Sequence, residues 1–190
     1  PMNMHSSTNP PATGSLLERA AAAYGFDDVA TAQQIGAAAL LRADHGGEIA
    51  TEELRENGYL LPDGPVTALA EEFRIVKRQL LLSAEANDRA RLVMVASAAP
   101  DEGKTFCAIN LALSLAAERD TEVLLVDADF PKPEILSTLG LANGDGLMDA
   151  IVDRTRDVES CVIRTSVPNL SVLPVGRACN DATELLASGR

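Results

Sequence analysis

Four residues of this chain have types and a spacing that point to phosphate chemistry: Lys104, Thr105, Asp127 and Asp129. The first two end the segment Ser97-Ala-Ala-Pro-Asp-Glu-Gly-Lys-Thr105, which follows an apolar run and opens a stretch of helical character. A turn in this position surrounds phosphate oxygens with backbone N–H groups, and the helix N-terminus adds partial positive charge. The sequence therefore predicts a phosphate-binding loop, with an ordinary strand-to-helix turn as the alternative.

This predicted loop departs from the GxxxxGK[ST] pattern at one position, because Ala98 stands where the pattern has its first glycine. In this interpretation Lys104 reaches the β- and γ-phosphates, and Thr105 offers its hydroxyl to Mg²⁺. The predicted phosphate-binding residues run from the loop into the helix and comprise Ala99, Pro100, Asp101, Glu102, Gly103, Lys104, Thr105 and Phe106.

The two aspartates follow the apolar run Val123-Leu-Leu-Val126. Ligands of open α/β sheets bind at the carboxyl ends of the strands, and side chains at i and i+2 of a strand share a face. We therefore predict that Asp127 and Asp129 both face the phosphates, where a carboxylate holds Mg²⁺ or accepts a proton from an attacking hydroxyl. In the alternative, Asp127 caps the strand end and Asp129 starts the next turn.

The elements around these residues predict an α/β fold. The apolar runs 92–96 and 123–126 are typical of strands buried on both faces of a parallel sheet, and 105–118 is Ala- and Leu-rich with helical character. Together they predict a strand-helix-strand unit. Further predicted elements are a helix at 146–152, a strand at 170–175 and a helix from 182 onward. The fold class is thus a P-loop NTPase-like parallel sheet flanked by helices, with an N-terminal helical extension.

The sequence divides into an N-terminal arm, a helical extension and the P-loop domain. Residues 1–14 are polar and contain prolines, which predicts a disordered arm, residues 15–88 form a helical region, and 89–190 form the first part of the P-loop domain. Within 15–88 we predict a helix at 15–24, a helix at 51–58 that ends at Gly58, and a turn at 61–65. Residues 15–48 carry no functional signal.

A further helix from Thr67 to about Ala84 has two distinct faces. Its predicted apolar stripe is Leu69, Phe73, Val76, Leu80 and Leu81, and its predicted charged face carries Glu71, Glu72, Arg74, Lys77 and Arg78. Charged faces of this kind are usually solvated, so without other information this face predicts no contact.

Composition excludes several classes of function. The net charge of −12, with 3% aromatic residues and no tryptophan, argues against binding to nucleic-acid backbones. The three cysteines, Cys107, Cys161 and Cys179, form no CxxC pair, which argues against a disulfide framework or a zinc site. The sequence shows neither a signal peptide nor a membrane-spanning run, so we expect a cytoplasmic location.

The run SAAPDEGKTFCAINLALSLA, followed by VLLVDADFPKP, resembles the bacterial tyrosine kinase family. These P-loop proteins have a Walker A loop, a Walker A′ strand that ends in DxD, and a Walker B strand. The helix segment Glu71-Glu-Phe-Arg-Ile-Val-Lys-Arg78 is similar to the family's ExxRxxR helix, with Lys77 at the third basic position. The stretch ELRENGYLLPDG and later segments resemble the subgroup associated with exosortase and exopolysaccharide gene clusters, so the resemblance covers about Ile49 to the C-terminus.

This resemblance implies ATP- and Mg²⁺-dependent autophosphorylation on tyrosine, in the control of exopolysaccharide synthesis or export. Lys104 would bind phosphates, Thr105 would ligate Mg²⁺, and Asp127 and Asp129 would handle Mg²⁺ and the tyrosine hydroxyl. It also implies a homo-oligomer formed through the helix with Glu71, Arg74, Lys77 and Arg78. A membrane-protein activator would recruit the kinase to the inner face of the membrane.

Three departures from the family pattern qualify these expectations. Phe130-Pro131-Lys132 stands where the family has an arginine after the aspartate pair, and no Walker B run follows Leu173. The tyrosines are Tyr24 and Tyr59 alone, with no C-terminal cluster. We therefore expect about half of a P-loop domain with an incomplete sheet, and we expect these 190 residues by themselves to bind nucleotide weakly and to lack autokinase activity.

Two other functions remain open alternatives. A partitioning-type ATPase of the same P-loop class carries an additional lysine early in the loop, where this chain has Ser97-Ala98-Ala99-Pro100. A non-catalytic interaction or regulatory module would keep the loop as a remnant and use the Glu71–Arg78 helix for assembly.

Overall fold

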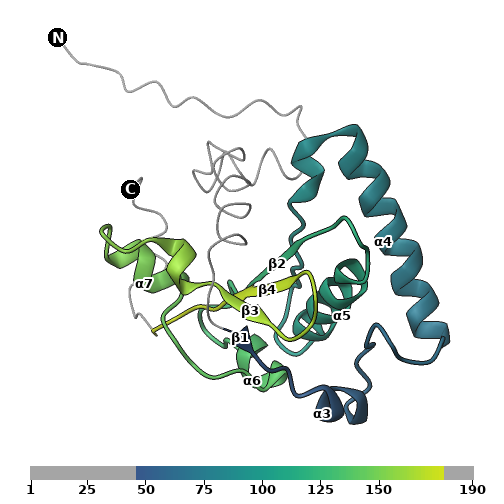
Figure 1. Ribbon diagram of the computed structural model, residues 1–190, viewed down its shortest axis with the longest axis horizontal. Helices are drawn as coiled ribbons and strands as arrows, with labels where there is room; N and C mark the ends of the chain where they lie inside the picture. Colours follow the sequence, from purple (N-terminus) through teal and green to yellow (C-terminus); the bar gives the residue numbers. More distant parts are fainter. Residues whose placement is uncertain (1–45, 178–190) are drawn as a thin grey trace.

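The computed structural model describes residues 46–177, which form a sheet with helices around it (Figure 1). The predicted arm at 1–14 and the predicted helices at 15–24 and from 182 lie outside these residues. The strands are β1 (Gly46–Gly47), β2 (Val123–Val126), β3 (Ile163–Thr165) and β4 (Leu170–Leu173). The helices are α3 (Thr51–Glu56), α4 (Ala68–Ala86), α5 (Lys104–Ala116), α6 (Ile135–Leu139) and α7 (Leu147–Val152), with 3₁₀ turns η1 (Asp88–Arg91) and η2 (Val158–Cys161).

The sheet has the order β1-β3-β4-β2 and is dominated by parallel pairs. Strand β2 runs parallel to β4, with Val123 opposite Leu170 and Val126 opposite Leu173, and β1 runs parallel to β3. The pair β3–β4 is antiparallel, and Asn169 (φ 62°) gives its turn the left-handed backbone that asparagine tolerates. The α/β fold class is confirmed. The antiparallel β3 escaped prediction because three residues are too few to show an alternation.

The predicted strand at 92–96 is wrong. In the structure these residues have no regular secondary structure, and Met94 is 70% exposed. The parallel neighbour of β2 is β4, and among residues 46–177 no strand pairs with 92–96. An apolar run becomes a buried strand only when its N–H and C=O groups find a ladder partner, so the predicted strand-helix-strand unit does not form here.

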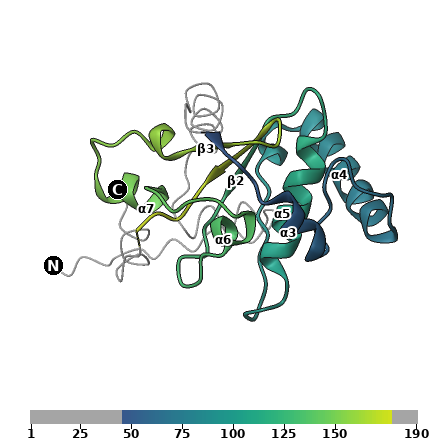
Figure 2. The ribbon, with the colours of Figure 1, turned by 60° about the horizontal axis from the view of Figure 1, so that its bottom comes forward.

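The main core lies between α5 and the sheet. Helix α5 contacts β2 and β4, and its buried positions Ile109, Asn110, Ala112, Leu113 and Ala116 follow the helical repeat that predicted it. The apolar residues of this set pack with Leu125 and Val172 from the strands and with Leu139 from α6. Figure 2 shows α5 between the strands and α4. The N-terminus of α5 is thereby held at the carboxyl end of β2.

Helix α4 packs on α5, and its inner face agrees only in part with the predicted stripe, of which Phe73, Leu80 and Leu81 are half-buried. Thr67 caps its start by accepting a hydrogen bond from Ala70 N at 3.1 Å. Val76, placed in the apolar stripe by prediction, is 44% exposed, whereas the Lys77 side chain is 14% exposed and its Nζ lies 2.6 Å from Glu118 Oε1. A lysine stem packs against apolar surface while its ammonium reaches a carboxylate, and hydrophobic periodicity does not anticipate this.

Two shorter predictions are confirmed. Helix α3 ends just before Gly58, whose φ of 79° is the left-handed value that favours glycine after a helix. Helix α7 lies within the predicted segment 146–152. Among the helices of residues 46–177, none combines the length and the apolar character that crossing a bilayer requires.

A buried carboxylate joins α7 to the end of β4. Asp149 accepts hydrogen bonds from Gly146 N at 2.9 Å, from Arg177 N at 3.1 Å and from Arg177 Nε. Gly146 must be glycine, because a Cβ there would lie 2.2 Å from the Pro174 carbonyl oxygen. Burial disfavours the charged carboxylate, but the hydrogen bonds from Arg177 and Gly146 outweigh it and hold the pKa of Asp149 below 3.8.

We expect Asp149→Asn to lower the free energy of unfolding by about 1–3 kcal/mol at neutral pH, the usual loss for a buried charged hydrogen bond. Because the folded-state pKa of Asp149 is depressed, its contribution is present above 3.8 and is lost as the pH falls through the folded-state value. Urea unfolding of both proteins across this range measures the difference. Asp145→Asn, which removes an exposed pair with Arg156, is the control. An unfolding difference independent of pH would contradict the assignment.

Candidate functional site

The predicted phosphate-binding loop is a turn that leads directly into α5. Asp101 (φ 61°) and Gly103 (φ 88°) have left-handed backbones, and α5 begins at Lys104 with no acidic side chain in its first turn. Glu102 folds back onto the loop and accepts a hydrogen bond from Ala99 N at 3.0 Å. The first N–H groups of a helix have no partner inside the helix, so this turn presents donors to an anion.

The loop forms one wall of an open cleft of about 540 Å³. Most of the predicted site residues line it: Ala99, Pro100, Asp101, Gly103, Lys104, Thr105, Phe106 and Asp129. Glu102 and Asp127 do not. Ser97 and Ala98 at the start of the predicted loop also line the cleft. Sequence reasoning had not placed the remaining lining residues in the site, namely Tyr59, Pro131, Lys132, Glu134 and Thr138.

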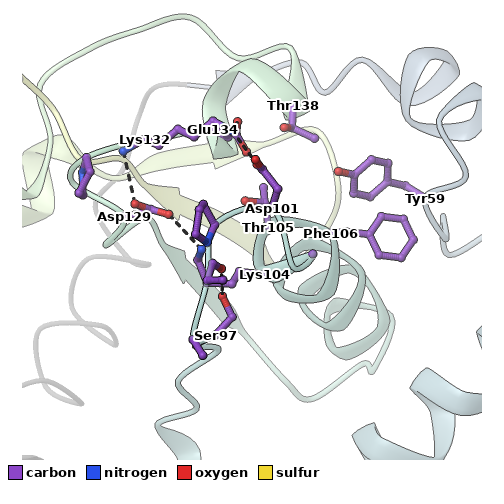
Figure 3. Close-up of a pocket in the computed structure, with 15 residues that line it drawn as sticks. Tyr59, Ser97, Asp101, Lys104, Thr105, Phe106, Asp129, Lys132, Glu134 and Thr138 are labelled. Carbon is purple, nitrogen blue, oxygen red and sulfur yellow. Dashed lines mark hydrogen bonds and ion pairs between the residues drawn. The ribbon is translucent and has the colours of Figure 1, made fainter.

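Lys104 and Asp129 approach each other across the cleft (Figure 3). Their Nζ and Oδ2 atoms are 3.6 Å apart, and the two side chains are 29% and 35% exposed. The pair brings the loop and the segment after β2 together, as the spacing predicted. Lys104 is therefore held at the cleft while its ammonium keeps access to solvent.

Asp127 occupies a different environment from Asp129. It is 3% exposed, its Oδ1 accepts from Asp129 N at 3.1 Å, and its Oδ2 accepts from Ile135 N at 3.2 Å. Strand β2 ends at Val126, so the strand alternation that would turn both carboxylates to one side does not continue. Burial raises the pKa of Asp127, and the two backbone hydrogen bonds oppose that rise.

An ion-pair group closes one side of the cleft. Lys132 Nζ lies 2.8 Å from Asp101 Oδ1 and 3.0 Å from Glu134 Oε1, so it joins the phosphate-binding loop to the start of α6. Hydrogen bonding to Asp101 and Glu134 raises the pKa of Lys132, and the same ammonium lowers the pKa of Asp101. Sequence analysis had noted Lys132 only as a departure from the family's arginine.

Two aromatic rings form the opposite side. Tyr59 and Phe106 have ring centroids 5.0 Å apart at an interplanar angle of 47°. The fully buried Asn110 fixes the chain beside Tyr59, since its Oδ1 accepts from Leu60 N at 2.7 Å and its Nδ2 donates to Phe106 O at 2.9 Å. No spacing rule connects Tyr59 with a loop that follows it by about 40 residues, so the sequence held no signal for this contact.

Comparison with known proteins finds bacterial tyrosine-protein kinases among the relatives of this chain. The tyrosine-protein kinase YwqD of Bacillus subtilis is 32% identical over 124 residues, which are 65% of this chain and 51% of YwqD. The succinoglycan biosynthesis transport protein ExoP of Rhizobium meliloti is 33% identical over 135 residues, 68% of this chain and 16% of ExoP. The matched region thus spans about half of one relative and less than a fifth of the other. No family-level sequence model matches the chain.

A solved structure supports the fold. The chimerical protein CapA2B2 matches with a TM-score of 0.53 and 24% identity over 82% of this chain and 65% of the other. The shared architecture is that of an α/β domain with a parallel-dominated sheet.

The ion-pair group around Lys132 has a measurable consequence. We expect Lys132→Met to raise the pKa of the Asp101 carboxyl toward 3.8, because the ammonium that lowers it is removed. Carboxyl-detected NMR titration of the two proteins measures the shift. Lys77→Met, which removes the ammonium paired with Glu118, is the matched control and leaves Asp101 unchanged. An unaltered Asp101 titration in Lys132→Met would show that the pair does not persist in solution.

Proposed function

Because bacterial tyrosine-protein kinases are among the relatives of this chain, we propose that it belongs to their P-loop family and transfers the γ-phosphoryl group of ATP to tyrosine hydroxyls. The observation that carries this proposal is the cleft in which the Gly103 turn, Lys104, Thr105 and Asp129 meet. Phosphoryl transfer requires little covalent chemistry from a protein, so positioning and charge stabilisation suffice.

The cleft fits a nucleoside triphosphate. Its volume of about 540 Å³ lies within the range of small-molecule sites, and its wall offers the N–H groups at the start of α5. Lys104 stands at the loop as a point charge for phosphate oxygens, held in place by Asp129 until a ligand displaces that contact. The phosphates would thus lie against the turn 99–104.

The oxygen donors of the cleft suit Mg²⁺. Thr105 and Asp129 line it with a hydroxyl and a carboxylate, the hard ligands that this ion prefers. Mg²⁺ commonly takes one or two protein ligands together with substrate phosphates. When bound, Mg²⁺ neutralises phosphate charge.

We propose separate roles for the two aspartates. Asp129 faces the cleft and would contact the metal and accept the proton of the incoming tyrosine hydroxyl. Asp127 acts through the backbone N–H groups of Asp129 and Ile135, which set the path of the loop. Of the two aspartates that the sequence predicted to face the phosphates, this division assigns that role to Asp129 alone.

We further propose that the kinase works in an assembly that controls exopolysaccharide synthesis or export. A relative named as a succinoglycan biosynthesis transport protein supports this context. A second copy would bind through Arg74 and Arg78 of α4, which are exposed. Within the chain, Arg74 pairs with Glu71 of the same helix and Lys77 pairs with Glu118. Recruitment by a membrane-protein activator belongs to the same proposal.

Removal of the Lys104 ammonium tests the proposed activity. We expect Lys104→Met to lower phosphoryl transfer from Mg·ATP to a tyrosine-containing copolymer by at least about 100-fold, the loss typical for one preorganised charge donor. Phosphotyrosine immunoblotting and fluorescent-nucleotide binding measure it. Cys107→Ala, on the same helix but outside the cleft lining, is the control. Equal phosphate release by Lys104→Met and the parent protein would favour the non-catalytic module.

A pair of amide substitutions tests the division between the aspartates. We expect Asp129→Asn to reduce phosphoryl transfer with little change in thermal stability. Asp127→Asn places an amide NH₂ against a backbone donor and lowers the free energy of unfolding by about 1–3 kcal/mol, the cost of a buried unsatisfied group. Differential scanning calorimetry and the copolymer assay separate the two effects. Loss of stability in both variants would refute the division.

Charge reversal on α4 tests the proposed assembly. We expect the double substitution Arg74→Glu and Arg78→Glu to lower the sedimentation coefficient. The introduced carboxylates would repel the acidic groups of the second copy that the arginines are proposed to contact. Arg55→Glu on α3, which removes an exposed pair with Glu52, is the control. An unchanged sedimentation profile for the double variant would count against this face.

A further inference from the structure

The lining of the cleft divides into a charged part and an aromatic part (Figure 3). The charged part holds the two ion-paired lysines, Lys104 and Lys132, with their carboxylate partners. The aromatic part holds Tyr59 and Phe106, whose ring centroids are 5.0 Å apart, and the Tyr59 hydroxyl is hydrogen-bonded to Thr138. The proposed phosphoryl transfer gives a role to the charged part and none to the two rings.

A nucleoside triphosphate has the same division, because its phosphates are charged and its base is an apolar aromatic ring. Phe106 lies on α5 two residues after Lys104, so the aromatic part adjoins the helical turn that would hold the phosphates. Ligand sites typically combine aromatic lining with a few polar groups that orient the ligand. Thr138 and the Tyr59 hydroxyl supply such groups beside the rings.

We propose that Tyr59 and Phe106 form the nucleobase subsite of the cleft, with the adenine ring of ATP stacked on Tyr59. The proposal rests on the proposed kinase function and assigns to Tyr59 the recognition of the base. Both rings are half-buried, so each packs into the protein on one side and still presents aromatic surface to the cleft. Aromatic rings attract one another in offset-stacked arrangements, and every nucleobase has a face that can stack.

The Tyr59 ring is held in place before a ligand arrives. The backbone N–H of Tyr59 donates to Leu54 O at 2.9 Å, and the N–H of Leu60 donates to Asn110 Oδ1 at 2.7 Å. The ring itself contacts Phe106 and, through its hydroxyl, Thr138. A side chain that is already ordered loses little conformational entropy when a ligand binds, which favours affinity.

This subsite makes the segment before the P-loop domain part of the nucleotide site. Tyr59 follows α3, within the region that the sequence predicted as a helical extension. Backbone hydrogen bonds attach this segment to the domain, since Ala50 N donates to Leu139 O at 3.0 Å. One bound nucleotide therefore contacts both predicted regions, with its phosphates on the loop and its base on the extension.

A ligand that lacks the base tests the proposal. We expect Tyr59→Leu to weaken the binding of Mg·ATP at least about 10-fold, the loss typical for one base–aromatic stack. Binding of Mg·tripolyphosphate should stay unchanged, because its contacts are confined to the charged part. Tyr59→Phe keeps the ring and should retain ATP binding, whereas Lys104→Met should weaken both ligands. Isothermal titration calorimetry measures all four proteins.

The outcomes separate this subsite from the proposed kinase function. Unchanged ATP binding in Tyr59→Leu would refute the subsite and leave nucleotide binding in the cleft standing. Equal weakening of ATP and tripolyphosphate would also refute it, because Tyr59 would then only support the fold of the loop. If neither ligand bound to the parent chain, both the subsite and the kinase function would be rejected.

A second measurement leaves Tyr59 intact. The chain has two tyrosines, so Tyr24→Phe makes Tyr59 the single tyrosine, and isotopically labelled tyrosine then gives one set of ring resonances by NMR. We expect Mg·ATP to shift these resonances upfield through the ring current of the stacked adenine, and Mg·tripolyphosphate to leave them in place. ATP binding without this upfield shift, or the same shift with both ligands, would place the base elsewhere and overturn the proposal.

Discussion

The buried carboxylate of Asp127 is the contact on which the site depends. The backbone N–H of Asp127 donates to Leu173 O, between β2 and β4, and its two carboxylate oxygens accept from the backbone N–H groups of Asp129 and Ile135. One residue thereby connects the end of a strand, the loop that carries Asp129, and the start of α6. A charged group is costly to bury, and both backbone donors offset that cost. The cleft thus derives its shape from a residue that does not line it.

The electrostatics of the cleft differ from those of the whole chain. The protein has a net charge of −12, yet two lysines face three carboxylates across the cleft, and each lysine is within 4 Å of a carboxylate from another segment. Such contacts hold both ammonium groups in place before any ligand arrives. When a phosphate enters, a lysine exchanges its carboxylate partner for a phosphate oxygen. This exchange requires less rearrangement than recruiting a mobile side chain from solvent.

Local patterns predicted the elements whose signal is contained within a few residues. The turn at Gly103, helix α5, strand β2 and the stop at Gly58 all depend on neighbours in sequence, and the aliphatic core of α5 follows its own periodicity. Residues 92–96 were misjudged because a strand depends on a partner elsewhere in the chain. The placement of Lys77, Asp127 and Tyr59 depends on tertiary packing, which a spacing rule does not contain. The chemistry of the loop was therefore accessible from sequence, while the opposite wall of the cleft was not.

The surface position of residues 92–96 has a consequence for handling the protein. Leu92, Val93, Met94 and Val95 are 46%, 41%, 70% and 36% exposed, and they directly precede the phosphate-binding loop. Apolar backbone that is not engaged in a ladder is a template for strand addition between molecules. Electrostatic repulsion from the acidic surface opposes such contact at low ionic strength and weakens as salt screens it. We therefore expect self-association through residues 92–95 to increase with ionic strength and with protein concentration.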